Sequence, residues 1–455
     1  MKLRNFSRLL MSAFVVMSIA SSCVKEGPMG LTGPAGADGK DGKDANETCK
    51  VCHSPASVDL IATQFQFSKH EYGEAAFEEA GNTSCTPCHA QEAFKDVVKR
   101  NVPSTFTLGA NGKYTLDYVT TASTAYGELG CSTCHSELHT TYGSADLAFT
   151  TVAPVSMVMW GGGKTIDLPA DGGVSNLCVK CHQPRPQMNL QTNNVQDYAS
   201  LIAKPNDLAY DANNDKATTN IIRPSYRMHV HYGSVGAIYA GKGGVEFGTG
   251  YTNSKHTTVA SCVDCHMGEM NERAGGHTFK VRNSADGTGL TAATKWNFNG
   301  CNVTGCHSDA PISAATTSKY WKQTRDEVKV LLDQLAAKLV VGGVDILNRS
   351  NDKEANLWYG LTTNNYDGYL NIYDPGLNPG GAGSANVTGT FQNTGNTSSY
   401  TAEQKAINSA LPKLSLTNAQ YGAILNFQLV LREYSLGIHN TAYTKTLLTN
   451  SIAAL

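Results

Sequence analysis

Apolar residues recur at the spacing of an α-helix in the last third of the chain, where three segments predict helices. The first is 319–341, whose apolar positions fall on one side of a helix: Trp321, Val328, Leu331, Leu332, Leu335 and Leu339. The others are 418–434 and 441–454, separated by a predicted break at 437–440. We expect these helices to pack as a clamp on the preceding part of the chain.

Two further segments are recognisable from composition and spacing. A short helix is predicted at 91–100, and the Gly-, Asn- and Ser-rich segment 360–400 predicts a loop. The chain holds 44 glycines among 455 residues, which fits a loop-rich shell. The expected fold class is therefore mainly α with extensive irregular loops.

The first residues have the pattern of an export signal. Three basic residues precede a short apolar segment, 9–19, which is too short to span a membrane as a helix. Small residues lead into Cys23, so 1–22 resembles a bacterial lipoprotein signal followed by a lipidated cysteine, although Ala20 stands where the usual pattern has Leu. The alternative is an ordinary secretory signal that leaves Cys23 as a spare thiol. Both predict export.

Glycine occupies every third position from Gly27 to Gly42, which is the spacing of collagen. A repeat this short makes a weak triple helix. We therefore expect residues 23–46 to be a lipidated, polar spacer that holds the rest of the chain off a membrane. Local association of three chains is the alternative, and it would make the protein an oligomer.

Cysteine and histidine give the strongest chemical signal. Cys-x-x-Cys-His occurs five times, and a sixth, stretched copy has four residues between its cysteines. In chain order the residues are Cys49, Cys52, His53; Cys85, Cys88, His89; Cys131, Cys134, His135; Cys178, Cys181, His182; Cys262, Cys265, His266; and Cys301, Cys306, His307. This pattern is typical of covalent haem c attachment, in which the thiols add to the porphyrin vinyl groups and the histidine is the proximal iron ligand.

A disulfide framework, zinc sites and iron–sulfur ligation also use paired cysteines. None of them requires a histidine directly after the second cysteine, and histidine makes up only 13 of 455 residues. We therefore predict six covalently attached haems in a hexahaem region, 47–310, wrapped around the haem array. A haem-free helical segment, 311–455, packs on it. The longer loop of the sixth motif leaves open the alternative that this motif is unused.

Each haem needs a second axial ligand, and seven histidines lie outside the motifs. His229 and His231 are two residues apart, so their side chains diverge in an extended segment and one of them is the spare. We expect His231 to be the ligand because the following Tyr232-Gly233 allows a close approach. The predicted distal ligands are His70, His139, His231, His256, His277 and His439. Methionine is the competing distal ligand, with Met188, Met228, Met267 and Met270 near the motifs.

Several stretches together resemble the multihaem cytochrome c group that includes ammonia-forming nitrite reductases and their non-catalytic electron-transfer relatives. The similarity spans most of 49–455, and the stretches that carry it are Ser68-Lys69-His70, Cys178–Arg185, Cys262–Met267, Gly275–Phe279 and Ser435–Tyr443. In that group the closing Gly-x-His element supplies a distal ligand, which implies this role for His439.

The chain departs from the catalytic members of that group in one respect. Nitrite reductases bind substrate at a haem with a Lys ligand in a Cys-x-x-Cys-Lys motif, which this sequence lacks. That counts against catalysis of this kind. Arg185, Tyr226, Arg227 and Tyr232 are the residues that would line an open haem, if one exists.

The sequence therefore favours an electron carrier over an enzyme, with no catalytic residue assigned. The expected function is electron transfer through mostly bis-His, low-spin haems of an outer-membrane or cell-surface lipoprotein, in the periplasm or outside the cell. Its expected partners are other redox proteins of the envelope. One alternative is a reductase of a small nitrogen or sulfur compound at one open haem, and another is a subunit of a cytochrome filament. A formal net charge of −2 predicts no nucleic-acid binding.

Overall fold

The computed structural model describes most of the chain after residue 54. The described residues are 55–71, 83, 85–100, 106–108, 114–116, 126–136, 138, 140, 144–160, 164–184, 189–190, 198–214, 222–224, 228, 230–283, 295–313, 319–349, 366–370, 372 and 413–455. The predicted signal and spacer, the first motif (Cys49–His53), His139 and His229 lie outside them. The described residues belong to one unit, Ser54–Leu455.

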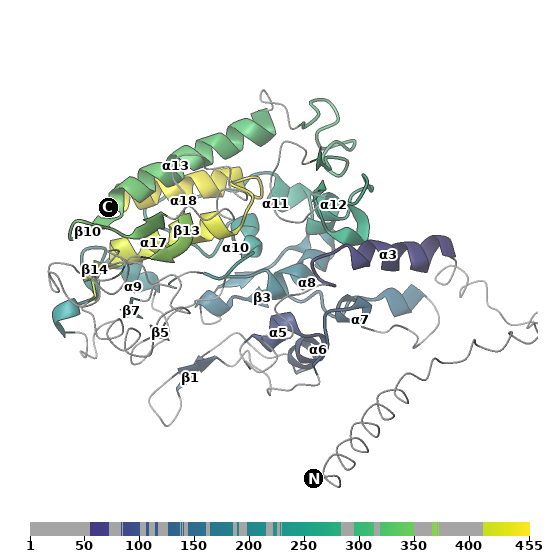
Figure 1. The fold of residues 1–455 in the computed structure, drawn as a ribbon, viewed down its shortest axis with the longest axis horizontal. Helices are drawn as coiled ribbons and strands as arrows, with labels where there is room; N and C mark the ends of the chain where they lie inside the picture. Colours follow the sequence, from purple (N-terminus) through teal and green to yellow (C-terminus); the bar gives the residue numbers. More distant parts are fainter. Residues whose placement is uncertain are drawn as a thin grey trace, which may run out of the picture. The chain divides into compact units, whose positions relative to one another are not determined.

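The described residues form mainly helices, many of them short (Figure 1). The α-helices are α3 (Leu60–Gln66), α5 (Thr86–His89), α6 (Gln91–Lys99), α7 (Cys131–Cys134), α8 (Val174–Cys181), α9 (Tyr198–Ala203), α10 (Val235–Ala240), α11 (His256–Val259), α12 (Cys262–His266), α13 (Thr324–Lys338), α17 (Asn418–Arg432) and α18 (Thr441–Ala454). Single turns of 3₁₀ helix are η2 (Ser144–Leu147), η3 (Val158–Trp160), η4 (Pro169–Asp171), η5 (Ala212–Asn214) and η6 (Gly276–Thr278), and η1 (Pro55–Asp59) and η7 (Lys319–Gln323) are π-helical turns.

Strands within the described ranges pair only two at a time, always antiparallel. The pairs are β1 (Phe106–Leu108) with β2 (Tyr114–Leu116), β3 (Val155–Ser156) with β4 (Thr165–Ile166), β5 (Asn189–Leu190) with β7 (Ile222–Arg223), β6 (Leu208–Tyr210) with β14 (Leu416–Thr417), β8 (Arg282–Asn283) with β9 (Lys295–Trp296), β10 (Val340–Val341) with β11 (Val344–Asp345), and β12 (Leu347–Arg349) with β13 (Tyr366–Leu370). Each pair joins two short stretches of loop through backbone hydrogen bonds.

The predicted C-terminal helices are present, with local signals that explain their ends. Thr417 caps α17 because its hydroxyl accepts the Gln420 backbone N–H at 3.2 Å, while the Gln420 side chain accepts the N–H of Thr417 at 2.9 Å. Asn440 caps α18 by accepting the Tyr443 N–H at 3.2 Å. The predicted single helix 319–341 is shorter than expected: it opens with the π-helical turn and ends at Lys338, after which β10 pairs with β11.

The main hydrophobic core lies between the C-terminal helices and the middle of the chain. Nearly every residue of α17 is buried, and α17 packs against α18, which packs against α13 (Figure 1). The apolar side predicted for α13 faces this core, with Val328, Leu332, Leu335 and Leu339 fully buried. The same cluster includes residues of 155–168 and 228–247, so the C-terminal helices and the motif-bearing region share one core.

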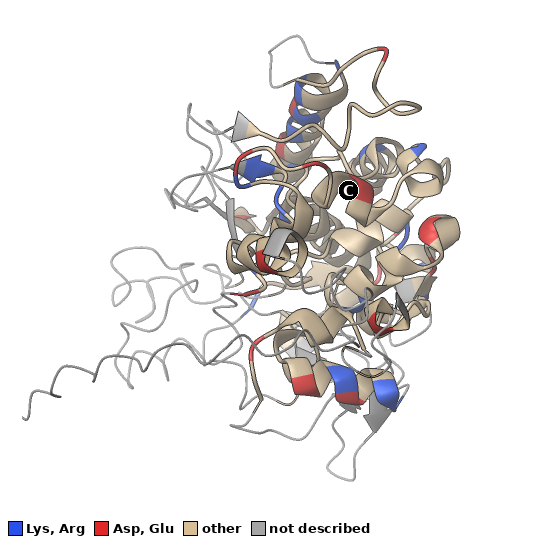
Figure 2. Cartoon of the chain, turned by 90° about the vertical axis from the view of Figure 1, so that its right-hand side faces the viewer, with Lys and Arg blue, Asp and Glu red and all other residues tan. Residues whose placement is uncertain are grey.

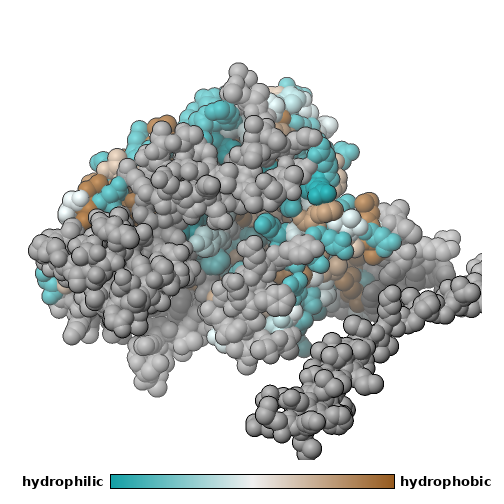
Figure 3. Space-filling view, viewed as in Figure 1, coloured by the Kyte–Doolittle hydropathy of each residue, from teal (hydrophilic) through white to brown (hydrophobic). Residues whose placement is uncertain are grey.

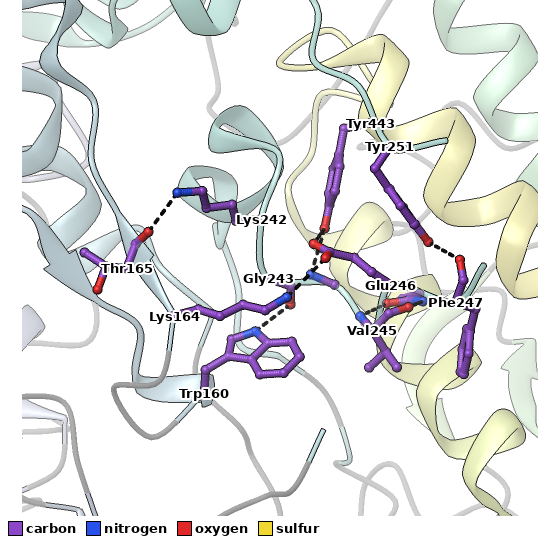
Figure 4. Close-up of polar contacts among 12 residues, drawn as sticks. Trp160, Lys164, Thr165, Lys242, Gly243, Val245, Glu246, Phe247, Tyr251 and Tyr443 are labelled. Carbon is purple, nitrogen blue, oxygen red and sulfur yellow. Dashed lines mark hydrogen bonds and ion pairs between the residues drawn. The ribbon is translucent and has the colours of Figure 1, made fainter. Parts of the chain in front are cut away.

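Polar contacts, some fully and some partly buried, connect α17 and α18 to the loop that follows α10. The Glu246 carboxylate accepts the Tyr443 hydroxyl at 3.0 Å and Lys164 Nζ at 3.2 Å, and the Gly244 N–H donates to the Tyr443 oxygen at 3.0 Å (Figure 4). Asn426 of α17 binds both backbone groups of Val245, at 2.7 and 2.8 Å. Hydrogen bonds, in addition to apolar packing, therefore hold this loop against the helices.

The exterior is mixed in character. Lys and Arg are interspersed with Asp and Glu along the described elements (Figure 2). Hydrophilic residues cover much of the described surface on the face in Figure 3, with separate hydrophobic patches between them. Among the helices of the described ranges, none is both long and apolar enough to cross a membrane.

Candidate cofactor site

Four of the described motif histidines each lie opposite a histidine from elsewhere in the chain. The ring centres are 6.0 Å apart for His89 and His231, 6.0 Å for His182 and His70, 6.3 Å for His266 and His439, and 6.0 Å for His307 and His256. All four partners belong to the predicted distal set. We number the sites 1 to 6 in the order of their motifs, so these pairs belong to sites 2, 4, 5 and 6.

The spacing of the rings suits one metal ion between them. Metal–imidazole bonds are about 2 Å long and a ring nitrogen lies roughly 1 Å from the ring centre, so two rings on opposite sides of one metal have centres about 6 Å apart. Haem iron takes two axial ligands, one on each face of the porphyrin. The pairs therefore fit the ligand set of a bis-His haem. No cluster of three or more His, Cys, Asp or Glu that could hold a metal ion occurs in the described ranges.

At site 3, His135 and His277 are close enough for the charge of one to affect the pKa of the other. Burial lowers the pKa of His277, and the charge of His135 lowers it further. His135 is the motif histidine of site 3, and His277 belongs to the predicted distal set. The predicted ligands His53 and His139 lie outside the described residues, as does the spare His229.

Hydrogen bonds fix which nitrogen of these rings is available. Six of the rings place Nδ1 against an oxygen that can only accept, namely a backbone carbonyl or a carboxylate. The pairs are His135 with Leu147 O at 2.9 Å, His182 with Gly233 O at 3.1 Å, His231 with Tyr232 O at 3.0 Å, His256 with Ile438 O at 3.1 Å, His266 with Phe279 O at 2.9 Å, and His439 with Glu433 Oε2 at 2.6 Å. Nδ1 must therefore donate, which leaves Nε2 of the neutral ring with a lone pair for a metal.

Burial also favours the neutral form of several rings. Desolvation, helped by the charges of neighbouring histidines, lowers the pKa of His70 to about 4. Desolvation likewise lowers the pKa of His266 to about 4, against a small opposing effect from the Phe279 carbonyl. Burial alone would lower the pKa of His439, but the hydrogen bond and charge of Glu433 raise it. A neutral imidazole is the form that ligates metal.

The stretched sixth motif closes in the same way as the regular ones. The histidine N–H donates to the carbonyl of the first cysteine at 3.2 Å in site 2 and at 3.0 Å in sites 3 and 4. In the sixth motif His307 N donates to Cys301 O at 3.1 Å despite the two extra residues. Gly305, with φ of 87°, supplies the left-handed turn that the longer loop needs. The motif thus presents two cysteines and a histidine as the others do.

The cysteines of different motifs lie close together. None of the ten motif cysteines in the described ranges is assigned to a disulfide, which agrees with thioether attachment. The side chains of Cys181 and Cys88, of Cys178 and Cys262, and of Cys265 and Cys301 are close enough to interact, and each interaction raises the pKa of the first thiol of the pair. The contacts connect sites 2, 4, 5 and 6 in that order. Cys134 of site 3 is close enough for its charge to act on Cys178 and Cys181 of site 4.

Three loops each serve two sites at once. The loop around His231 also holds His182 through Gly233 O, and the loop around His277 holds His266 through Phe279 O. The loop between α17 and α18 carries His439 and holds His256 through Ile438 O. In each loop, a predicted ligand and the carbonyl that orients another predicted ligand are one or two residues apart.

One of the candidate methionines, Met228, has a different role. Met228 is fully buried in the hydrophobic core cluster, so it packs rather than facing a motif histidine. Met188 lies outside the described residues, as do Arg185, Tyr226 and Arg227 of the hypothetical open haem. The guanidinium of Arg432 lies over the Tyr232 ring, with its Cζ atom 4.2 Å from the centre of that ring.

The oxygens that orient the rings could not be found from the sequence. Gly233 and Ile438 act through backbone carbonyls, which leave no signature in residue type, and Glu433 lies six residues before its partner. The only possible signal in the sequence was that an acid, Glu433, and a histidine, His439, lie close together along the chain. Comparison of the chain with protein-family models, curated proteins and solved structures gave no match, so the family resemblance of the sequence stays a prediction.

Proposed function

We propose that the chain is an exported hexahaem c-type cytochrome that carries electrons at the cell envelope. The main support for the proposal is the set of four motif histidines. Each faces a second histidine, and the ring centres are about as far apart as two rings that bind one metal ion from opposite sides. The donor chemistry agrees, because the Nδ1 hydrogen bonds leave Nε2 free for a metal.

The residues divide into three roles. The paired cysteines attach the cofactor, the motif and distal histidines hold its iron, and the acceptor oxygens fix the ring orientations. When bound, haem supplies a one-electron Fe(III)/Fe(II) couple at each site, tuned by axial ligands, burial and hydrogen bonds. Contacts between the cysteines of sites 2, 4, 5 and 6 support an array of adjoining sites.

The alternative reductase needs an iron with an open position. At sites 2, 4, 5 and 6 a second histidine stands opposite the motif histidine, and at site 3 His277 is near His135. An open haem is therefore most compatible with site 1, whose motif lies outside the described residues. The filament alternative stays a prediction of the sequence, and so do the envelope location, the lipid at Cys23 and the redox-protein partners.

Haem counting in cysteine variants tests the proposal. The full chain is expressed in a bacterium with a c-type haem maturation system, and covalent haem per chain is measured with peptide masses for each motif. We expect six haems, falling to five when Cys301 and Cys306 are both changed to Ser. The matched control is Cys23→Ser, which should retain six haems while losing the lipid. Absence of covalent haem, or zinc or an iron–sulfur cluster in its place, would refute the proposal.

A further inference from the structure

The loop between α17 and α18 is folded around one buried carboxylate. Glu433 is fully buried, and its Oε1 accepts the Ser435 hydroxyl at 2.9 Å and the Gly437 N–H at 3.2 Å. Its Oε2 accepts Nδ1 of His439 at 2.6 Å. The Ser435 oxygen in turn accepts the His439 N–H at 3.1 Å. The loop thereby fixes both the position and the rotation of the His439 ring.

The backbone is bent to make these contacts. Tyr434 and Leu436 adopt left-handed conformations, with φ of 67° and 55°, which are costly for residues other than glycine. Glu433 also follows the last residue of α17, where the helix dipole disfavours a negative charge. Burial lowers the pKa of Arg325 of α13, and the nearby charge of Glu433 opposes this shift; the positive charge of Arg325 in turn offsets part of the cost at Glu433. Helix stability therefore does not explain an acid at this position.

The acceptor at His439 differs in kind from the others. Of the six Nδ1 hydrogen bonds described above, five end on backbone carbonyls and the sixth ends on this carboxylate. A carboxylate draws the Nδ1 proton more strongly than a carbonyl, so the ring becomes more electron-rich and a stronger donor at Nε2. A stronger, more anionic ligand favours Fe(III) over Fe(II) and lowers the reduction potential.

We propose that Glu433 is a positioning residue that lowers the reduction potential of site 5 through His439. The inference rests on the proposed function and deepens it. Site 5 lies between sites 4 and 6 in the chain of cysteine contacts, Cys178 with Cys262 and Cys265 with Cys301. Its potential therefore determines how readily an electron resides in the middle of that row, and Glu433 sets this value from within the haem-free segment.

The test is a spectropotentiometric titration of the holoprotein with Glu433→Gln, which keeps the shape of the side chain and removes its charge. We expect one of the six redox components to shift to a more positive potential and one low-spin signal in electron paramagnetic resonance (EPR) to move. Glu433→Asp, which restores the charge, should return the potential towards the parent value. A variant with Cys262 and Cys265 both changed to Ser identifies the shifted component, because that component should be missing.

Glu246→Gln is the matched control, since Glu246 is a partly buried acid that accepts a hydrogen bond from α18 but orients no histidine. It should leave all six potentials unchanged. Six haems with unshifted potentials in Glu433→Gln would overturn the inference while leaving the proposed function intact. A new high-spin signal instead of a shift would also overturn it, because Glu433 would then be needed for ligation itself. Absence of covalent haem in the parent protein would instead refute the proposed function.

Discussion

Removing the Asn426 side chain should weaken the attachment of the C-terminal helices to the loop at 243–247. Its Oδ1 accepts Val245 N–H at 2.7 Å, and its Nδ2 donates to Val245 O and to the Ser451 hydroxyl oxygen, both at 2.8 Å. Asn426, Val245 and Ser451 are all fully buried. The change Asn426→Ala therefore removes three hydrogen bonds from a site that water does not reach.

The expected loss of stability depends on which buried groups keep a hydrogen-bond partner after the substitution. Val245 O still accepts Phe247 N–H, and the Ser451 hydroxyl still donates to Leu447 O. The Val245 N–H loses its acceptor, and a buried donor without a partner costs about 1–3 kcal/mol. Each of the two other lost bonds costs about 0.5–1 kcal/mol. We expect Asn426→Ala to lower the free energy of unfolding by about 2–5 kcal/mol in total.

Urea unfolding of the holoprotein, followed by helical circular dichroism, measures this loss. The matched control is Asn450→Ala in α18, which removes bonds from Nδ2 to Phe247 O at 2.7 Å and Thr249 O at 3.0 Å. It leaves no backbone donor without an acceptor, so only the two lost bonds of about 0.5–1 kcal/mol each count and its cost should stay under about 2 kcal/mol. Equal midpoints for the two variants would refute the assignment of Asn426 as a buried connection between the helices and this loop.

Two further outcomes are expected. Gly300→Ala should reduce covalent haem from six to five per chain, because the added Cβ would overlap the backbone carbonyl oxygen of Asp264 inside the fifth motif; six haems in this variant would contradict the packing of Gly300 on that motif. Burial raises the pKa of Tyr251 to about 12 and raises the pKa of Tyr443 further above its usual value. Since unfolded tyrosine ionises near about pH 10, their contribution to stability is complete below that pH and is lost as the pH rises through the folded pKa. Urea midpoints between pH 8 and 11 should therefore fall less steeply in Tyr251→Phe than in the parent, and parallel curves would contradict the shift.

The parts of the molecule that follow from local sequence were predictable. Helix α18 has the predicted bounds, and Asn440 of the predicted break caps it, whereas α17 ends at Arg432, before the break. The segment 360–400 was predicted as a loop, but Tyr366–Leu370 forms β13 because it finds a partner in β12, a tertiary contact that composition does not reveal. The end of α13 was misjudged for a different reason: Val340–Val341 pairs with Val344–Asp345 as a local hairpin across Gly342 and Gly343.

The pairing of the histidines was beyond the sequence. His70 faces His182 and His266 faces His439, partners more than a hundred residues apart, and no local pattern relates them. The candidate distal residues could be named because histidine is rare in this chain. Which ring faces which motif depends on how α3, α8, α12 and the last loop pack. The orientation of the rings depends on backbone carbonyls, which every residue has.

An EPR spectrum of the fully oxidised holoprotein, with haem quantified on the same sample, tests the central claim most directly. We predict six haems per chain and only low-spin signals, because the proposed ligand set gives each iron two histidines. His70→Ala provides the calibration, since it leaves His182 without its facing ring and should add a high-spin signal of one haem. A high-spin signal of about one haem per chain in the parent protein would contradict the claim that it is solely an electron carrier. Nitrite and hydroxylamine reduction would then be the next assays.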